Sequence, residues 1–476
     1  MRFHRCLLPV AAFLAVSPLL PTLAANEADK PPLSAAEEAR LQRAQELVDQ
    51  SNALGEQGRG AENTPLREEA LRLTREVLWP DHPQTLLRLR EYAVAVWVNQ
   101  SAGEAVSLFE EIYDRRSATL GARDPEALSD LNSLAFILNK AGRIDEAEAA
   151  YRKVIAEREQ LLGDSDQDTL VSISQYAGLL ETEGRDAEAA VQFRLAWHRF
   201  RDSAGEGDPR TLMQLSNLAA LLERTGRYDE AEPLYAELLR IRREVLGDTH
   251  PDTIISHNRY AVILDYLDRN EEAQAYYKRA FELAEEANGP LDSTTLALQG
   301  LYAAFLLQNE QPEPALQLLR DYVALTTQAN GPRDSATVIA RTVYANALIG
   351  AERWTEGVRE YDEAIRLRRE VIGDTDPDTI REMDQYARLL ALTGRGSDAI
   401  PVYADLYRLK SQMFGATSDE TLRTLLLYAS QLDLMGQKIE SEPLFARALS
   451  AYREQGDRGI AQTITVLTRY ASVLEG

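Results

Sequence analysis

The sequence predicts an all-α fold, a right-handed α-solenoid of about ten antiparallel helix pairs. A marker residue recurs every 42 residues from Thr85 to Thr463, without insertion or deletion, and only Ala127 departs from threonine. An alanine follows each marker by eight residues, and the residue directly after each marker is aliphatic. A fixed period of this length is typical of a stacked array, in which each repeat packs only on its neighbours.

Each repeat is expected to contain two helices. In residues 211–226, apolar side chains recur at intervals of three and four, which places them on one face of a helix. Gly226 is expected to end this helix, because glycine adopts the left-handed conformation at low steric cost. Residues 228–246 have the same kind of spacing and form the predicted second helix, which Gly247 ends.

The segment GDTHPDT, residues 247–253, is predicted to separate one helix pair from the next. His250 stands where most copies have aspartate, the usual acceptor at a helix N-terminus. Pro251 follows at the first helical position, where its missing N–H costs nothing. Two related copies, DSDQD and DTDPD, resemble calcium loops, but the glycine and the closing glutamate of an EF-hand are missing. We therefore expect no metal site.

The array is expected to occupy most of the 476 residues. The predicted segments are a signal peptide (1–24), a flexible lead (25–33), a degenerate N-terminal helix pair (34–82), nine 42-residue repeats (83–460) and a C-terminal capping helix (461–476).

The first residues have the features of a secretory signal. Arg2 and Arg5 precede an apolar run, and small residues permit cleavage after Ala24. The run is short for a membrane anchor and contains two prolines. We expect export to the periplasm or the outside of the cell, with no membrane span in the mature chain. The single cysteine, Cys6, lies inside the leader, so the mature chain has neither disulfides nor thiol chemistry.

Charge and motifs narrow the function further. The net charge of −24 opposes nucleic-acid backbones and anionic membranes. The sequence contains no HExxH, GxSxG or glycine-rich phosphate loop, and its carboxylates recur with the repeat instead of forming an isolated acid–base pair. We expect a non-catalytic protein without a cofactor.

The repeats resemble tetratricopeptide repeats. The best copies are LNSLAFILNKAGRIDEAEAAYRKVIAEREQLLG, from Leu131, and LSNLAALLERTGRYDEAEPLYAELLRIRREVLG, from Leu215. The 42-residue period is similar to that of the longer, kinesin-light-chain type, although the coiled-coil heptads of kinesin light chains are missing. The resemblance implies a scaffold that binds a protein or peptide segment in a groove lined by the first helices. It does not identify the partner.

The groove positions implied by the resemblance are rich in small polar side chains. Such a row can hydrogen-bond an extended peptide backbone, although it can also be simply a solvated inner face. The candidate groove-binding residues are Asn132, Ser174, Gln175, Ser216, Asn217, Asn258, Thr342 and Asn346.

Three consecutive repeats depart from the pattern. Four residues after the marker, where other copies have a large apolar residue, they have His257, Gln299 and Arg341. The same repeats lose the glycine between their two helices. Buried polar groups cost free energy unless they are paired, so this row predicts either a hydrogen-bond chain or a ligand pocket.

The sequence is also compatible with two other functions. The apolar C-terminal helix, with Leu467 and Tyr470, suits a structural or assembly protein that forms a homodimer. Residues 253–352 suit a site for a small molecule such as a sugar or a cell-wall fragment.

Overall fold

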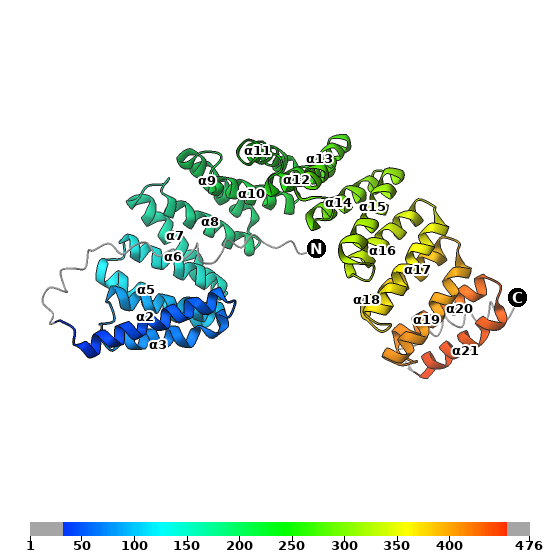
Figure 1. The fold of residues 1–476 in the computed structure, drawn as a ribbon, viewed down its shortest axis with the longest axis horizontal. Coiled ribbons are helices and arrows are strands. Elements are labelled where there is room, and N and C mark those ends of the chain that lie inside the picture. Colours follow the sequence, from blue (N-terminus) through cyan, green and yellow to red (C-terminus); the bar gives the residue numbers. More distant parts are fainter. Residues whose placement is uncertain (1–31, 455–476) are drawn as a thin grey trace. The chain divides into compact units, whose positions relative to one another are not determined.

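The computed structural model describes residues 32–454, which form two compact units, one up to Leu246 and the other from Gly247. The described residues form twenty α-helices and one short 3₁₀ helix, and they contain no strand. Within each unit, successive helices pack side by side in chain order (Figure 1). The predicted fold class, an all-α solenoid, is confirmed.

The first unit begins with an additional helix pair, which is followed by four repeats. We call the first helix of each repeat its A helix and the second its B helix. The helices are α2 (Ala35–Glu56), η1 (Gly60–Glu62), α3 (Thr64–Arg75), α4 (Pro83–Asn99), α5 (Ala102–Leu120), α6 (Pro125–Lys140), α7 (Ile144–Leu161), α8 (Gln167–Thr182), α9 (Asp186–Ala204), α10 (Pro209–Arg224) and α11 (Tyr228–Leu246).

The second unit contains five described repeats, which again alternate A and B helices. The helices are α12 (Pro251–Tyr266), α13 (Asn270–Asn288), α14 (Ser293–Gln308), α15 (Pro312–Asn330), α16 (Ser335–Gly350), α17 (Trp354–Val371), α18 (Pro377–Leu392), α19 (Gly396–Phe414), α20 (Asp419–Leu434) and α21 (Lys438–Glu454).

The A helices begin as the sequence predicts. Asp208 accepts a hydrogen bond from the backbone N–H of Arg210, and five other aspartates cap A helices in the same way. His250 takes this role in α12, where its Nδ1 accepts from the N–H of Asp252 at 3.2 Å. The segment 247–253 is therefore a helix-to-helix connection, as expected.

The marker threonine and the alanine of each repeat are buried for structural reasons. All nine described alanines, from Ala93 to Ala429, have no exposed surface. Thr211 donates its hydroxyl to the carbonyl of Gly205 at 2.9 Å, and Thr169 and Thr337 make the same bond to their preceding loops. In these three repeats the marker therefore ties the helix start to the connection that precedes it.

The turn between the A and B helices requires a left-handed residue. Most copies have glycine there, with φ between 72° and 78°. Asp268, Glu310 and Glu352 adopt the same conformation with φ of 58°, 56° and 61°. A side chain makes this conformation costly, so these three repeats are strained at the turn.

Several predictions concern residues outside the described range. The signal peptide, the flexible lead up to residue 31 and the C-terminal helix with its proposed dimer contact all lie there, and the domain boundaries remain predictions. Among residues 32–454, no helix combines the length and the apolar character needed to cross a membrane.

Candidate functional site

The polar row of the first unit is partly used to join neighbouring A helices. The Asn132 amide on α6 donates to Gln175 Oε1 on α8 at 2.8 Å. Its carbonyl oxygen accepts from the hydroxyl of Ser172 at 2.9 Å. Asn132 is buried, and both ends of its amide are engaged. These two predicted groove residues, Asn132 and Gln175, therefore meet each other across a repeat boundary.

The other predicted groove residues of the first unit differ in how far their side chains are exposed to solvent. Ser174 is half-buried and donates its hydroxyl to the carbonyl of Leu170, in its own helix, at 2.8 Å. On α10, Ser216 is half-buried and Asn217 is exposed. The part of this row that is open to solvent therefore centres on α10.

The predicted residues of the second unit are similarly mixed. Asn258 is half-buried on α12, and Thr342 is buried and donates to the carbonyl of Val338 at 3.1 Å. Asn346 is exposed on α16, where its side chain also reaches the hydroxyl of Tyr361. Burial raises the pKa of that hydroxyl to about 12, and the bond from Asn346 opposes the rise.

The three anomalous residues hold helix pairs together. Each one reaches the B helix of its own repeat, at the residue that follows it by 19 positions. Gln299 donates to the carbonyl of Leu318 at 3.0 Å, and Arg341 forms an ion pair with Glu360 at 2.5 Å. The ring of His257 lies 5.7 Å from the ring of Tyr276, measured between centroids. This common register places the row between the two helices of each pair, not in an open groove.

A ladder of buried and half-buried basic residues was not anticipated from the sequence. A cation on a B helix contacts a polar residue 14 positions later, on the following A helix. The two partners are 14 residues apart in every pair, so the same pairing could have been found by aligning the 42-residue repeats. The pairs are Arg116–Asp130 (2.5 Å), Arg158–Ser172 (2.8 Å), Arg368–Glu382 (2.9 Å) and Lys410–Thr424 (3.0 Å).

This ladder connects with the polar row of the first unit. Arg158 is buried, and burial lowers the pKa of its guanidinium. Its two Nη atoms donate to Ser172 on α8 and to Ser129 on α6, at 2.8 and 2.9 Å. Because Ser172 also contacts Asn132, the row is one face of a network that stabilises the repeat interface.

A different surface is open on the A helices of the second unit. Positions 2, 6 and 9 after the marker lie on one helix face, and in three consecutive repeats the residues there are apolar except Arg259 and Asn346. Its exposed large side chains have 40–47% of their surface accessible, and smaller apolar residues accompany them. We call this surface the apolar stripe, formed by Ile255, Ala297, Leu301, Ala304, Ile339 and Val343.

The apolar stripe does not continue onto α18, where the same positions hold Arg381, Gln385 and Arg388, all exposed. On α10 they hold Met213 and Ala220 beside the exposed Asn217. Exposed apolar residues that lie singly are normal, whereas a cluster on one helix face indicates an interaction surface. The stripe falls in the repeats with His257, Gln299 and Arg341, although those side chains point between the helices.

Within residues 32–454, no group of three or more histidine, cysteine, aspartate or glutamate side chains is arranged to hold a metal ion. The candidate surfaces are also built from hydrogen-bonding and apolar groups, which suit recognition of a polypeptide.

Comparisons with known proteins identify the class. Family models described as tetratricopeptide repeat match residues 51–84, 131–168 and 211–286. The chain therefore contains tetratricopeptide repeats, as predicted. Their 42-residue period is similar to that of the kinesin-light-chain type. Proteins with these repeats are generally non-catalytic and typically bind protein partners.

Solved structures similar to this chain share low sequence identity with it. BtubC (BKLC) from P. vanneervenii is 20% identical, with 48% of this chain and 92% of that chain covered and a TM-score of 0.39. A tetratricopeptide repeat protein from Parabacteroides merdae is 15% identical over 62% and 98%, with a TM-score of 0.35. The apo form of the quorum sensor NprR from B. thuringiensis is 16% identical over 84% and 99%, with a TM-score of 0.36. No curated protein matches the chain.

Proposed function

We propose that the protein is a non-catalytic scaffold that binds an apolar segment of a partner protein along the apolar stripe on α12, α14 and α16. The observation that carries the proposal is the exposure of large apolar side chains at the same face positions of these A helices. Covering them removes apolar surface from water, which contributes about 25 cal/mol for each Å² buried.

The composition of the stripe favours a helical or extended apolar segment over a nucleic acid or a sugar. Gly300 is half-buried and Gly350 is exposed on these A helices, and both lack a side chain that would hold a partner away. In addition, the net charge of −24 repels anionic polymers. The polar row of the first unit stabilises the fold in this proposal and is not the binding surface, because Asn132 and Gln175 bond each other.

Site-specific photocrosslinking tests the proposal. Benzoylphenylalanine replaces Leu301, or Ile439 as a matched control, since Ile439 is a strongly exposed aliphatic residue on α21, outside the stripe. Each protein is irradiated in an envelope extract of the native organism, with and without the additional change Val343→Glu. We expect one partner to crosslink at position 301, and Val343→Glu to abolish the crosslink.

The outcomes separate the alternatives. Equal crosslinking at positions 301 and 439, or none at position 301, refutes the stripe as the binding surface. A crosslink between two copies of this chain makes the stripe a self-association surface and supports the assembly function instead.

We also propose that the protein is exported after cleavage behind Ala24, on the strength of its leader sequence. N-terminal sequencing of the protein isolated from envelope and culture fractions tests this, and it should begin at Ala25. A protein recovered from the cytoplasm with its leader intact would contradict export.

A further inference from the structure

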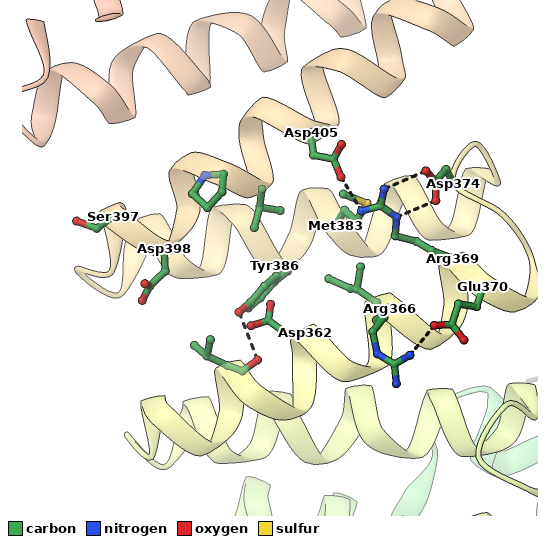
Figure 2. A pocket seen from close by; sticks show the side chains of 14 residues that line it. Asp362, Arg366, Arg369, Glu370, Asp374, Met383, Tyr386, Ser397, Asp398 and Asp405 are labelled. Carbon is green, nitrogen blue, oxygen red and sulfur yellow. Dashed lines mark hydrogen bonds and ion pairs between the residues drawn. The ribbon is translucent and has the colours of Figure 1, made fainter.

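A cavity of about 650 Å³ opens in the second unit between the B helices α17 and α19, with α18 as its floor (Figure 2). It lies where α17 and α18 pack, which is the loosest contact between successive α-helices inside either unit. Its volume falls in the range of sites that hold small ligands or peptide side chains. This cavity is separate from the apolar stripe, which α12, α14 and α16 form.

Both arginines that line the cavity are already paired. Arg369 binds Asp374 through two hydrogen bonds of 2.8 and 2.9 Å, and it reaches Asp405 on α19 at 2.6 Å. Figure 2 shows this guanidinium between the two carboxylates. Arg366 is held by two carboxylates of α17, Glu363 and Glu370. Neither cation is available to a carboxylate at the other end of the cavity.

That other end holds a carboxylate, Asp362 on α17, which no cation of the described residues 32–454 pairs with. Its partner is the hydroxyl of Tyr386, which lies beside it in Figure 2 and also donates to the carbonyl of Val358 at 3.5 Å. The nearby Asp398 adds negative charge and is itself paired with Arg395 at 2.6 Å. Although Asp362 is exposed at the mouth, partial burial of its carboxyl raises its pKa.

Other repeats have a cation in the same register. Arg152 Nε donates to the hydroxyl of Tyr176 at 3.0 Å, and Arg320 Nε donates to the hydroxyl of Tyr344 at 3.3 Å. Each arginine precedes its tyrosine by 24 residues, and Asp362 precedes Tyr386 by the same interval. An acid therefore replaces the arginine in the repeat that contains the cavity.

We propose that this cavity binds a lysine or arginine side chain of a partner protein, with the ligand's cation at Asp362 and Tyr386. The cation then takes the place that Arg152 and Arg320 occupy in their own repeats. The inference rests on the proposed scaffold function in one respect, which is that the ligand is a side chain of a partner protein.

The walls of the cavity suit the methylene stem of such a side chain. Val358 on α17, Met383 on α18, and Pro401 and Val402 on α19 line it with apolar surface. Long basic side chains bury their aliphatic stems on surface of this kind and keep the charged end at polar groups. A carboxylate that contacts an ammonium or guanidinium forms a charge-assisted hydrogen bond, which is stronger than a neutral one.

Methionine methyl NMR on the full chain tests the inference. The chain has five methionines, of which Met383 lines the cavity and Met213 lies in the first unit as an internal control. The probes are the amides of acetyl-Leu-Lys-Leu, acetyl-Leu-norleucine-Leu and acetyl-Leu-Glu-Leu, together with free cadaverine. We expect the lysine peptide to shift the Met383 signal saturably and leave Met213 unchanged, and the other two peptides to bind at least tenfold more weakly.

Two variants locate the site. Asp362→Asn should weaken binding of the lysine peptide at least tenfold, whereas Asp321→Asn, the same change at an exposed position of α15, should leave it unchanged. Val402→Phe should block binding by filling the cavity, so the test does not depend on one variant. Leu301→Glu should leave peptide binding intact, which separates this inference from the scaffold proposal.

The inference is overturned if Met383 does not respond up to millimolar lysine peptide, if the glutamate peptide shifts it equally, or if Asp362→Asn has no effect. Cadaverine that binds as tightly as the lysine peptide would overturn the choice of a protein ligand, in favour of a free diamine.

Discussion

Replacing Glu352 by glycine should stabilise the second unit. Glu352 adopts φ of 61° in the turn between α16 and α17. The left-handed conformation costs a residue with a side chain about 1–2 kcal/mol. Glycine avoids this cost but loses about 0.5–1 kcal/mol more conformational entropy on folding. The difference predicts a gain of about 1 kcal/mol in the free energy of unfolding for Glu352→Gly.

The adjacent residue provides a matched control. Ala351 has φ of −86°, a conformation that alanine adopts without strain. Ala351→Gly should therefore lower the free energy of unfolding by about 0.5–1 kcal/mol, because glycine adds conformational entropy to the unfolded chain and there is no backbone strain for it to relieve. Two substitutions to glycine, one residue apart, are expected to have opposite signs.

Hydrogen exchange of α16 and α17 is a suitable assay, because repeat proteins open locally and a single global transition can hide the effect. A gain of 1 kcal/mol slows exchange from the open state about fivefold. If Glu352→Gly accelerates exchange, or if both substitutions have the same sign, strain at the turn is not the controlling term. Asp268→Gly and Glu310→Gly should act independently of Glu352→Gly, since separate turns share no partners.

Three further predictions concern packing and pH. Glu148, on α7, accepts a hydrogen bond from Arg185, which lowers the pKa of its carboxyl to about 2. The carboxylate therefore stabilises the fold fully at pH values above its ordinary pKa of 4.5, and this stabilisation is lost as the pH falls toward 2. Glu148→Gln should cost about 2 kcal/mol at pH 7 after allowance for solvent exposure, and urea titrations should show the loss shrinking below pH 4.5. Gly357→Ala should cost about 1–2 kcal/mol in urea titrations, because its new methyl would lie 2.6 Å from Ile349 Cγ1, and Ile349→Ala should relieve the loss. Asn132→Ala should cost about 1 kcal/mol in the same assay by removing the hydrogen bonds to Gln175 and Ser172, and it should not affect crosslinking at the apolar stripe.

Each of these predictions has a clear contrary result. A cost for Glu148→Gln that is constant between pH 7 and pH 3 would contradict the ion pair with Arg185. Additive costs for Gly357→Ala and Ile349→Ala would contradict the proposed clash. Loss of partner crosslinking in a folded Asn132→Ala protein would restore the polar row as a binding surface.

The repeat architecture could be predicted because its signals are local. His250 and Pro251 mark a helix start through their own backbone and side-chain chemistry, and Gly226 marks a turn in the same way. The 42-residue period repeats these signals in each unit, so the helix pairs followed from the sequence alone. The loss of glycine at Asp268, Glu310 and Glu352 was also visible there, although the strain required the backbone angles.

The roles of the polar side chains depended on neighbours that are distant in sequence. Asn132 is a surface residue or a structural one according to whether Gln175, 43 positions later, lies within reach. Gln299 and Arg341 suggested a pocket until the facing B helix provided Leu318 and Glu360. The helix period indicates which residues share a face, but it does not show which face the neighbouring helix covers.

The sequence alone therefore specified the order, length and capping of the helix pairs, because those properties depend on residues a few positions apart. The tertiary structure decided which polar residues bond within the repeat interfaces and which apolar side chains remain exposed on α12, α14 and α16. It also decided that α17, α18 and α19 line a cavity. These features depend on close packing between neighbouring helices, where a difference of one methyl group changes the contact, and a periodic pattern does not encode that detail.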